Sequence, residues 1–585
     1  MNKKILKPIL ILIIMVSIAS AVFGCAHHTK NQLVQRQFDN FMNDIFVQEV
    51  QSDSLSLNYS LAHPENYGIK DASPTFGKYG LSQMKKDWAN SEAELKKLQS
   101  YQYDKLSSKQ KLTYEIVKSY LEQQIKFKKY PYYSECLGPT TGIQAQLPIL
   151  LAEFAFNDKK DIEEYLKLLP CIKGYFSDII EYEREKSENG LFMNDSVAKR
   201  IIAQCQAFIE EPQNNFLIGY FNDKISHFKG LSATQIEDYK KSNTEAVLCY
   251  IVPAYQSLID ALTDLLGTGK NNAGLYYYPK GKNYYECLAQ SKVGTNETMD
   301  QMIELLNSGI NRSMANLNAL TQSDPDVINK YLDFSSFPLT NPNEILNDLK
   351  KDITKDFPAA VPVDCQIKFV PPSLSEFLSP AMYLVPPIDS FKNNNIYING
   401  NNKETLSMIY TTVAHEGYPG HLYQCVYFRN QNPPPIRNVL DFTGYDEGWA
   451  TYVEFYSYHL SGIDNKLADF LEDNNIIILC MYARADIGIH YQGWKKEQVV
   501  KYIKQYIEDE DAAGEIYNTL LEEPAIYLPY AVGYLQIEDL RSDAESALGD
   551  SFVAKDFHKF LLDMGPSQFE IIKQHMNKWI QTAKK

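Results

Sequence analysis

The chain has 585 residues, which is enough to bury a large hydrophobic core and more than one ordinary domain needs. It carries 57 Lys and Arg against 73 Asp and Glu, giving a formal net charge of −16 at pH 7. An acidic chain of this kind argues against nucleic acid and anionic lipid headgroups as binding partners.

The N-terminus has the pattern of a secretory signal. Lys3 and Lys4 precede an apolar run over residues 9–23 that is short for a membrane span and ends in small residues. Residues 22–25 resemble a lipoprotein signal, so we expect residues 1–24 to be removed and Cys25 to become the lipidated first residue. An uncleaved anchor is the alternative. Two acyl chains suffice for stable attachment, and the protein would then lie outside the cytoplasm, anchored to the cell membrane.

Residues 25–36 are polar and are expected to form a tether. Helical periodicity dominates after residue 37, with apolar residues at i, i+3 and i+4 in segments such as 161–169 and 302–306. We expect an N-terminal helical lobe over residues 37–345 and a second, catalytic lobe over residues 346–585.

The pattern changes between residues 360 and 400. Three short segments, 365–372, 382–387 and 395–400, are rich in β-formers and are interrupted by Pro or Gly, which predicts a small sheet. We expect the last of them, with Asn395, Tyr397 and Asn399, to be an edge strand. An extended peptide substrate can add to such an edge through main-chain hydrogen bonds.

Residues 415–421, with the sequence His-Glu-Gly-Tyr-Pro-Gly-His, carry the strongest chemical signal in the chain. Neutral imidazole is the commonest protein ligand of zinc, and a carboxylate beside a bound metal acts as a general base on water. Two unrelated histidines at a helix end are the simpler alternative. The pattern favours a metal-dependent hydrolase, with His415 and His421 as ligands and Glu416 as the base.

The six-residue spacing of the two histidines requires a break in the helix. In an unbroken helix the two side chains would point roughly 120° away from each other. Pro419 has no N–H to bond the carbonyl of His415, and Gly417 and Gly420 relax the backbone. We therefore expect the helix to be distorted so that His421 turns back toward His415.

A third ligand is expected from residues 446–454. Glu447 and Glu454 are seven residues apart, hence on one helical face, within an aromatic and apolar stretch. Acids that face a core are costly unless they are paired or metal-bound. We interpret Glu447 as the third ligand and Glu454 as the residue that orients a ligand histidine. The alternative is that both carboxylates face solvent.

Asp486 and His490 form a second candidate pair. They lie one helical turn apart, so the carboxylate can fix the tautomer of the imidazole. We expect His490 to help stabilise the oxyanion of a tetrahedral intermediate, although a lone histidine is often structural.

The metal motif resembles that of a known family. Residues 415–421 together with Glu447-Gly448-Trp449-Ala450 resemble the bacterial family catalogued as domain of unknown function number 885, which is grouped with zinc metallopeptidases of the gluzincin type. Further landmarks at residues 59–64, 142–148 and 557–561 extend the resemblance over roughly residues 40–582. Family members often carry a second histidine after the motif, where this chain has Leu422, so a role for that extra ring is in doubt.

The resemblance implies a fold and a further site residue. It implies an architecture similar to that of the thimet oligopeptidases and Taq-type carboxypeptidases, and a tyrosine-bearing segment, residues 523–534, that faces the metal. Within this segment we expect Tyr530 to donate to the oxyanion. A buried structural tyrosine is the alternative. We thus expect a mainly α protein whose two helical lobes surround a central channel, with a small sheet beside the metal-binding helix.

The expected function is hydrolysis of peptide bonds in oligopeptides by one Zn²⁺ ion, which His415, His421 and Glu447 hold with one position left for water. Two alternatives remain. The chain is a non-catalytic lipoprotein that captures peptides or glycans around a structural metal, or it is a cell-wall amidase that acts on peptide cross-links.

Overall fold

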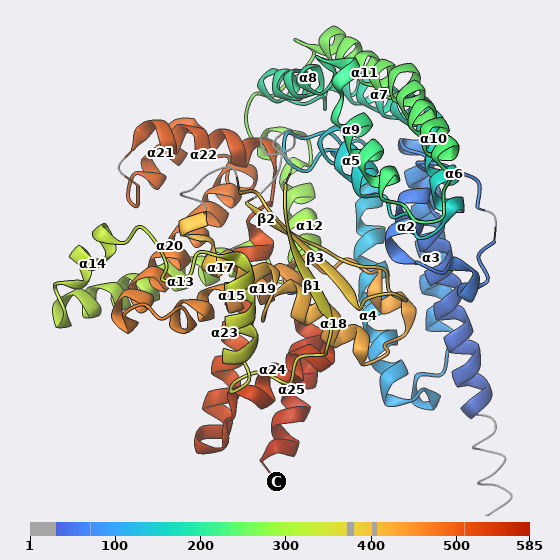
Figure 1. The fold of residues 1–585 in the computed structure, drawn as a ribbon. Coiled ribbons are helices and arrows are strands. Elements are labelled where there is room, and N and C mark those ends of the chain that lie inside the picture. The colour runs from blue at the N-terminus through green and yellow to red at the C-terminus, as the bar shows by residue number, and fades with distance from the viewer. Residues whose placement is uncertain (1–30, 71, 371–379, 401–405, 508, 585) are drawn as a thin grey trace, which may run out of the picture.

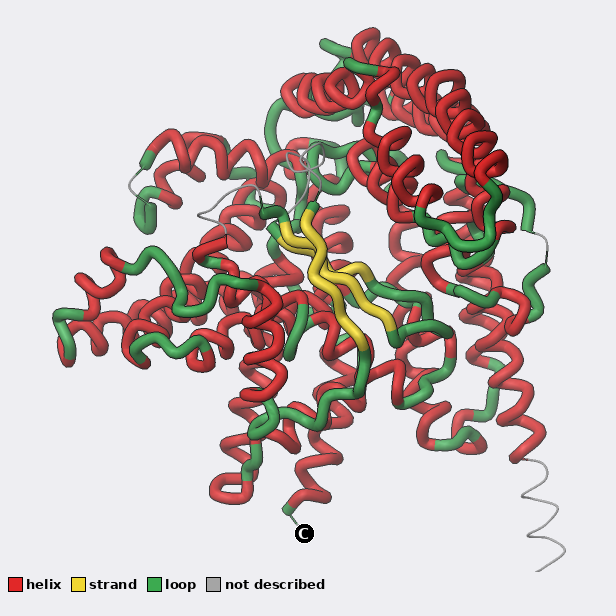
Figure 2. The backbone as a smooth tube through the Cα atoms, viewed as in Figure 1, coloured by secondary structure: helices red, strands yellow, loops and turns green. Residues whose placement is uncertain are grey.

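The structure is a computed structural model that describes residues 31–70, 72–370, 380–400, 406–507 and 509–584. The predicted signal, Cys25 and part of the predicted tether lie outside the described residues. Helices surround a small sheet at the centre of the molecule (Figures 1 and 2). The prediction of a mainly helical protein with a small sheet is confirmed.

The N-terminal part of the chain forms the blue to green helices of Figure 1. One hydrophobic cluster joins the helix over residues 31–50 to its neighbours α3 and α4, and a second cluster joins α5 to α11. The helices of this part are that over residues 31–50, α2 (Ser54–Ser60), α3 (Leu81–Gln99), α4 (Ser108–Lys126), α5 (Ile143–Glu153), α6 (Lys159–Leu168), α7 (Ile172–Glu188), α8 (Asp195–Ile209), α9 (Phe216–Ser226), α10 (Ala233–Ala246) and α11 (Val252–Leu265).

Residues Ala233–Leu265 form one continuous helical stretch, from α10 through a π-helical turn into α11, that is long and apolar enough to cross a membrane. Half of its most apolar window is buried inside the protein. Residues such as Tyr255 and Leu258 pack into the second cluster, so the apolar composition is explained by burial in a protein core.

The remaining helices share the largest core, except those over residues 496–503 and 510–522, which belong to a smaller cluster. They are α12 (Gly281–Val293), α13 (Met299–Ser323), α14 (Val327–Asp333), α15 (Pro342–Asp352), α17 (Ile409–Glu416), α18 (His421–Asn430), α19 (Thr443–Tyr456), α20 (Asn465–His490), α21 (Lys496–Ile503), α22 (Glu510–Glu522), α23 (Leu528–Leu548), α24 (Ala554–Met564) and α25 (Phe569–Ala583). Met302 and Leu306 of α13 belong to the same cluster as Val413 and Trp449. The clusters do not follow a single boundary in the chain, since Ile116 of α4 belongs to the largest core and Ile436 belongs to the first cluster. The lobe boundary at residue 345 therefore stays a prediction.

The sheet corrects the predicted substrate edge. Its strands are β1 (Asp364–Phe369), β2 (Ala381–Leu384) and β3 (Asn393–Ile398), in the order β1-β3-β2. β3 is parallel to β1 and antiparallel to β2, so Asn395 and Tyr397 lie on the central strand with partners on both sides. Asn399 follows the strand, and its N–H donates to the carbonyl of Pro380. The prediction of an edge strand over these three residues is wrong, because three short β-segments do not reveal their order.

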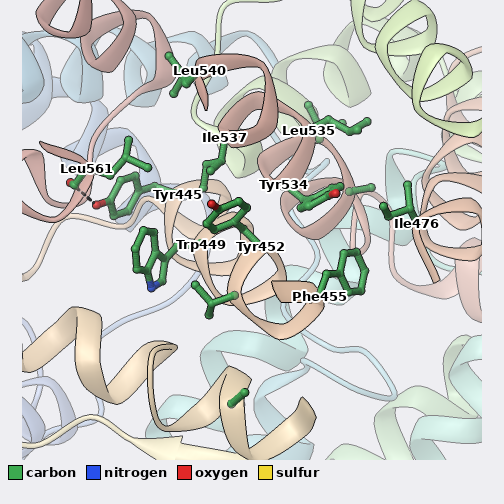
Figure 3. Packing of buried hydrophobic residues seen from close by; sticks show 14 of the residues in the cluster. Tyr445, Trp449, Tyr452, Phe455, Ile476, Tyr534, Leu535, Ile537, Leu540 and Leu561 are labelled. Atoms are coloured by element: carbon green, nitrogen blue, oxygen red, sulfur yellow. Dashed lines mark hydrogen bonds between the residues drawn. The ribbon is translucent and has the colours of Figure 1, made fainter. Parts of the chain in front are cut away.

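Close packing of α19 against α23 sets the position of the later site residues. Figure 3 shows Tyr445 and Trp449 of α19 with Tyr534 and Ile537 of α23 in one buried group. The two backbones approach at Gly533, where a Cβ atom would lie 2.2 Å from the carbonyl oxygen of Gly444. Only glycine permits this approach, which brings Glu447 and Tyr530 to the same part of the molecule.

Replacing Gly533 by Ala is expected to lower the free energy of unfolding by about 1–3 kcal/mol, because a methyl group must push the two backbones apart. Gly219 of α9 is a matched control, since a Cβ there would meet nothing within 4 Å. Gly219→Ala is expected to leave stability unchanged or to raise it by up to about 1 kcal/mol. Urea unfolding of both variants measures the difference, and equal midpoints for Gly533→Ala and the unchanged protein would contradict the close-packing argument.

Candidate metal centre

A break between two helices brings the histidines together. α17 ends at Glu416 and α18 begins at His421, with Gly417 and Gly420 in non-helical conformations between them. A Cβ atom at Gly420 would lie 1.8 Å from the carbonyl oxygen of His415, so the turn requires glycine at this position. The Trp449 indole N–H donates to the carbonyl of Pro419 at 2.9 Å and ties the turn to α19. The predicted distortion of the helix is confirmed.

The three predicted ligands meet in space. The ring centroids of His415 and His421 lie 4.8 Å apart, and the Nε2 atoms lie 3.5 and 3.4 Å from Oε2 of Glu447. One ligand atom from each residue falls within 4.8 Å of the other two. Ligand atoms about 2.0–2.2 Å from a tetrahedral ion lie about 3.3–3.6 Å apart, so the two distances between imidazole and carboxylate fit zinc.

The hydrogen bonds around the three residues also fit a metal. His415 Nδ1 lies 2.9 Å from Oε2 of Glu454, so an Nδ1–H donor here leaves the Nε2 lone pair facing Glu447. Oε2 of Glu447 is buried and has no hydrogen-bond partner among the described residues. A buried carboxylate oxygen without a donor is costly, and a cation at this position would satisfy it.

The two histidines and Glu447 shift one another's pKa values. Burial opposes the charged form of His415, but the neighbouring carboxylates of Glu447 and Glu454 outweigh the effect of burial and raise the pKa of His415 well above the usual value. The pKa of His421 is raised in the same way, mainly through Glu447. Burial also opposes the charged form of Glu447, yet the two imidazoles, whose Nε2 atoms lie 3.5 and 3.4 Å from its Oε2, lower its pKa. The carboxylate therefore stays ionised, and protons on the two rings compete with any cation.

Glu416 and Tyr530 face the same cavity, which has a volume of about 490 Å³. Oε2 of Glu416 accepts the backbone N–H of Tyr383, on β2, at 2.8 Å. The Tyr530 ring stacks on His415 with centroids 6.4 Å apart. Burial, followed by the charges of Glu447 and Glu416, raises the pKa of Tyr530, so its hydroxyl keeps its proton. A carboxylate and a phenol thus stand beside the three ligand residues.

A family model matches nearly the same part of the chain as the resemblance seen in the sequence. The family described as "Bacterial protein of unknown function (DUF885)" matches residues 65–576. The chain belongs to this family. None of the curated proteins matches this DUF885 chain.

Two solved structures have the fold of this DUF885 protein. One is described as a "putative lipoprotein from Colwellia psychrerythraea"; it is 19% identical, has a TM-score of 0.81 and covers 94% of this chain and 99% of its own. The other is described as a "putative lipoprotein of unknown function from Shewanella oneidensis"; it is 16% identical, with a TM-score of 0.63 and coverage of 93% and 99%. At these identities the likeness establishes the fold alone.

The structure contradicts the role predicted for His490. Its Nε2 lies 2.8 Å from the carbonyl oxygen of Leu520, and its Nδ1 accepts the N–H of Leu275 at 3.1 Å. Main-chain groups therefore occupy both ring nitrogens, and the residue lines a different cavity from the one at the metal centre. Burial lowers the pKa of His490 to about 4, so the ring is neutral. In this protein His490 is a buried residue whose ring nitrogens are held by main-chain groups.

Asp486 does not fix the His490 tautomer either. Its Oδ1 lies 3.9 Å from His490 Nε2, too far for a hydrogen bond, and instead accepts from the hydroxyl of Tyr285 at 2.7 Å. Burial raises the pKa of Asp486 to about 7. Helical spacing placed the two residues on one face correctly, but it did not reveal that each has a better partner on another element.

The neutral state of His490 predicts a pH effect on stability. The unfolded ring, with a pKa near 6.5, takes up a proton as the pH falls, whereas the folded ring does not until about pH 4. His490→Gln is destabilising at pH 7, and its deficit relative to the unchanged protein is expected to shrink by about 2 kcal/mol at pH 5. Urea unfolding at both pH values measures this change. A deficit for His490→Gln that is the same at both pH values would contradict the burial argument.

Several side chains of the cavity were not predicted from the sequence. Arg429 lies eight residues after His421 on α18, so the two share a helical face, and this spacing was available as a signal. Asp446, directly before Glu447, also lines the cavity, and burial raises its pKa to about 8. Arg437 reaches the cavity from a 3₁₀-helix, where no sequence pattern pointed to it.

Proposed function

We propose that this DUF885 protein is a zinc-dependent peptidase that hydrolyses peptide bonds in oligopeptides. The observation that carries the proposal is the group formed by His415, His421 and Glu447, with the carboxylate of Glu416 beside it in one cavity. A structural zinc site ordinarily closes its fourth position with a protein ligand, whereas a catalytic site has three protein ligands and an open position. A gluzincin-like architecture is part of the same proposal.

The residues around the cavity have distinct roles in this reaction. When bound, zinc would polarise the scissile carbonyl and lower the pKa of water. Glu416 accepts the proton of the attacking water and passes it to the leaving amine, while the N–H of Tyr383 fixes one of its oxygens. The protonated hydroxyl of Tyr530 donates to the developing oxyanion. Glu454 orients His415 through its Nδ1 atom.

The substrate is proposed to lie along β2 instead of β3. Ala381, Met382 and Tyr383 of β2 line the cavity, and β2 lies at an edge of the described sheet. An extended peptide placed beside this strand would bring a carbonyl group next to Glu416.

The test is an assay of the purified, zinc-loaded protein against a peptide library and against purified muropeptides. We expect peptides to be cleaved, cleavage to stop on chelation and to return when zinc is added. Binding of peptides or glycans without any cleavage would indicate a capture protein with a structural metal. Cleavage of muropeptides alone would indicate a cell-wall amidase.

We further propose that the protein is anchored outside the cytoplasm through lipid on Cys25. The two proteins of the same fold are described as putative lipoproteins, and residues 22–25 of this chain resemble a lipoprotein signal. Cys25→Ser is expected to move most of the protein from the detergent phase to the aqueous phase on phase separation, because two acyl chains are lost. The exposed Cys249→Ser is the control and should stay in the detergent phase. Retention of Cys25→Ser in the detergent phase would favour an uncleaved anchor.

A further inference from the structure

The cavity continues along one face of α18, away from the metal centre. The α18 residues that line it follow the i, i+3, i+4, i+7, i+8 pattern of a single helical face and are His421, Gln424, Cys425, Phe428 and Arg429. The three metal-binding candidates lie at one end of this face, and Arg429 lies at the other. Arg437 and Asn438 line the same cavity.

Both arginines of this cavity lack an acidic partner. Nη1 of Arg429 donates to the carbonyls of Pro386 and Pro387, and its other two nitrogens have no hydrogen-bond partner among the described residues. Arg437 is only 3% exposed, and its Nη2 donates to the carbonyls of Met564 and Pro566. Its Nε atom is buried without a hydrogen bond, and within the described part of the chain neither arginine forms an ion pair.

Arg437 has two carbonyl acceptors and lies over the ring of Phe428, 5.4 Å from its centroid, but no carboxylate among the described residues pairs with its charge, which indicates an anionic ligand. Burying a charge is costly unless it is paired, and burial of Arg437 lowers its pKa to about 10. The Arg429 side chain is half-buried, so a ligand in the cavity can reach its unpaired nitrogens. A guanidinium group matches the two oxygens of a carboxylate with parallel hydrogen bonds.

The distance from the metal-binding residues to Arg429 can be estimated in two ways. Along α18, eight residues from His421 to Arg429 correspond to about 12 Å, and side chains lean back toward the helix N-terminus, which shortens the gap. Along the facing segment, the N–H of Tyr383 donates to Glu416, and the carbonyl of Pro386 accepts from Arg429. These two positions are three residues apart, or about 10 Å in an extended chain. An extended peptide covers this distance with two or three residues.

We propose that Arg429, assisted by the charge of Arg437, binds the C-terminal carboxylate of a peptide substrate. The carboxylate at Arg429 would place the bond two or three residues before the C-terminus beside Glu416. Addition of one water across that bond would release a dipeptide or a tripeptide with its own free carboxylate. The cleavage step rests on the proposed peptidase function, whereas carboxylate binding does not.

The alternative is that the peptide continues past Arg429, because an open groove lies beyond this residue. It shares Arg429 and Asn438 with the cavity and continues past Asp39 and Tyr67. A longer peptide that runs through this groove would pass Arg429 without ending there, and the enzyme would then cut internal bonds. The state of the peptide's C-terminus therefore discriminates between the two modes.

Equilibrium binding to the Glu416→Gln protein tests carboxylate recognition without turnover. The probes are pairs of tetra- to hexapeptides that differ only in a free or an amidated C-terminus, titrated by calorimetry with zinc present. We expect the free acid to bind about 10- to 100-fold more tightly, as is typical of a hydrogen-bonded charged group. Equal affinities in this folded protein would overturn the proposal.

Variants at Arg429 locate the effect. In the same Glu416→Gln background, Arg429→Met is expected to reduce the affinity for the free acid to that for the amide, and Arg429→Lys to keep part of the preference. The exposed Arg184→Met on α7 is the control and should keep the full preference. A preference that survives in Arg429→Met would place the carboxylate site elsewhere and overturn the assignment.

Product analysis with the unchanged, zinc-loaded protein completes the test. Release of di- or tripeptides from the C-terminus of peptides of different length supports the proposal, and cleavage at scattered internal bonds overturns it. Discrimination between acid and amide without any cleavage would retain Arg429 as a carboxylate site and reject the peptidase proposal instead.

Discussion

Replacing Glu416 by Gln is expected to lower kcat/KM for peptide hydrolysis by about 10²–10⁴-fold while one zinc ion per chain is still bound. The amide has nearly the shape of the carboxylate, but it cannot accept the proton of the attacking water. Glu416 is not one of the three residues whose ligand atoms converge, so its loss leaves the metal-binding group intact. The measurements are steady-state kinetics and zinc content after dialysis.

The control for this substitution removes a carboxylate far from the cavity. Glu237 of α10 is exposed and forms a surface ion pair with Lys240, so Glu237→Gln should leave both activity and zinc content unchanged. Full activity in Glu416→Gln would exclude Glu416 as the general base. Loss of zinc together with activity would instead assign Glu416 to the metal site.

The sequence was sufficient to predict that His415, His421 and Glu447 converge, because these residues lie close together in the chain. Pro419 and the two neighbouring glycines predict a break, and the break occurs between His415 and His421. The seven-residue spacing of Glu447 and Glu454 predicts one helical face, and from α19 Glu447 reaches both rings while Glu454 reaches His415. Local spacing rules apply directly to residues that one or two adjacent helices carry.

Predictions that depended on contacts between distant segments were less successful. The order of the three strands depends on which segments pair across about 30 residues. The residue types in β3 suit a central strand and an edge strand equally well. The partners of His490 come from Leu275 and Leu520, neither of which is near it in sequence. A buried histidine that main-chain groups satisfy has the same local sequence as one that acts on a substrate.

Removing a ligand provides a test of the metal centre that does not depend on catalysis. His421→Ala is expected to weaken zinc binding by well over about 100-fold, because a nitrogen ligand is lost and the imidazole cannot be replaced by a methyl group. Zinc that is present at about 1,000 times its Kd should stabilise the unchanged protein by about 4 kcal/mol and should have little effect on this variant. Thermal unfolding with and without zinc measures the difference, and the exposed His227→Ala should respond like the unchanged protein.

The residues around the proposed zinc ion should differ in how much their loss weakens zinc binding. Glu454 touches His415 only through Nδ1, so Glu454→Gln should cost about 10–100-fold in zinc affinity, less than His421→Ala. Because the carboxylates raise the pKa of both histidines, protons compete with zinc, and the affinity of the unchanged protein should fall as the pH falls. If His421→Ala binds one zinc as tightly as the unchanged protein, the ion is held elsewhere, and the converging imidazoles and Glu447 form an ordinary buried hydrogen-bonded cluster.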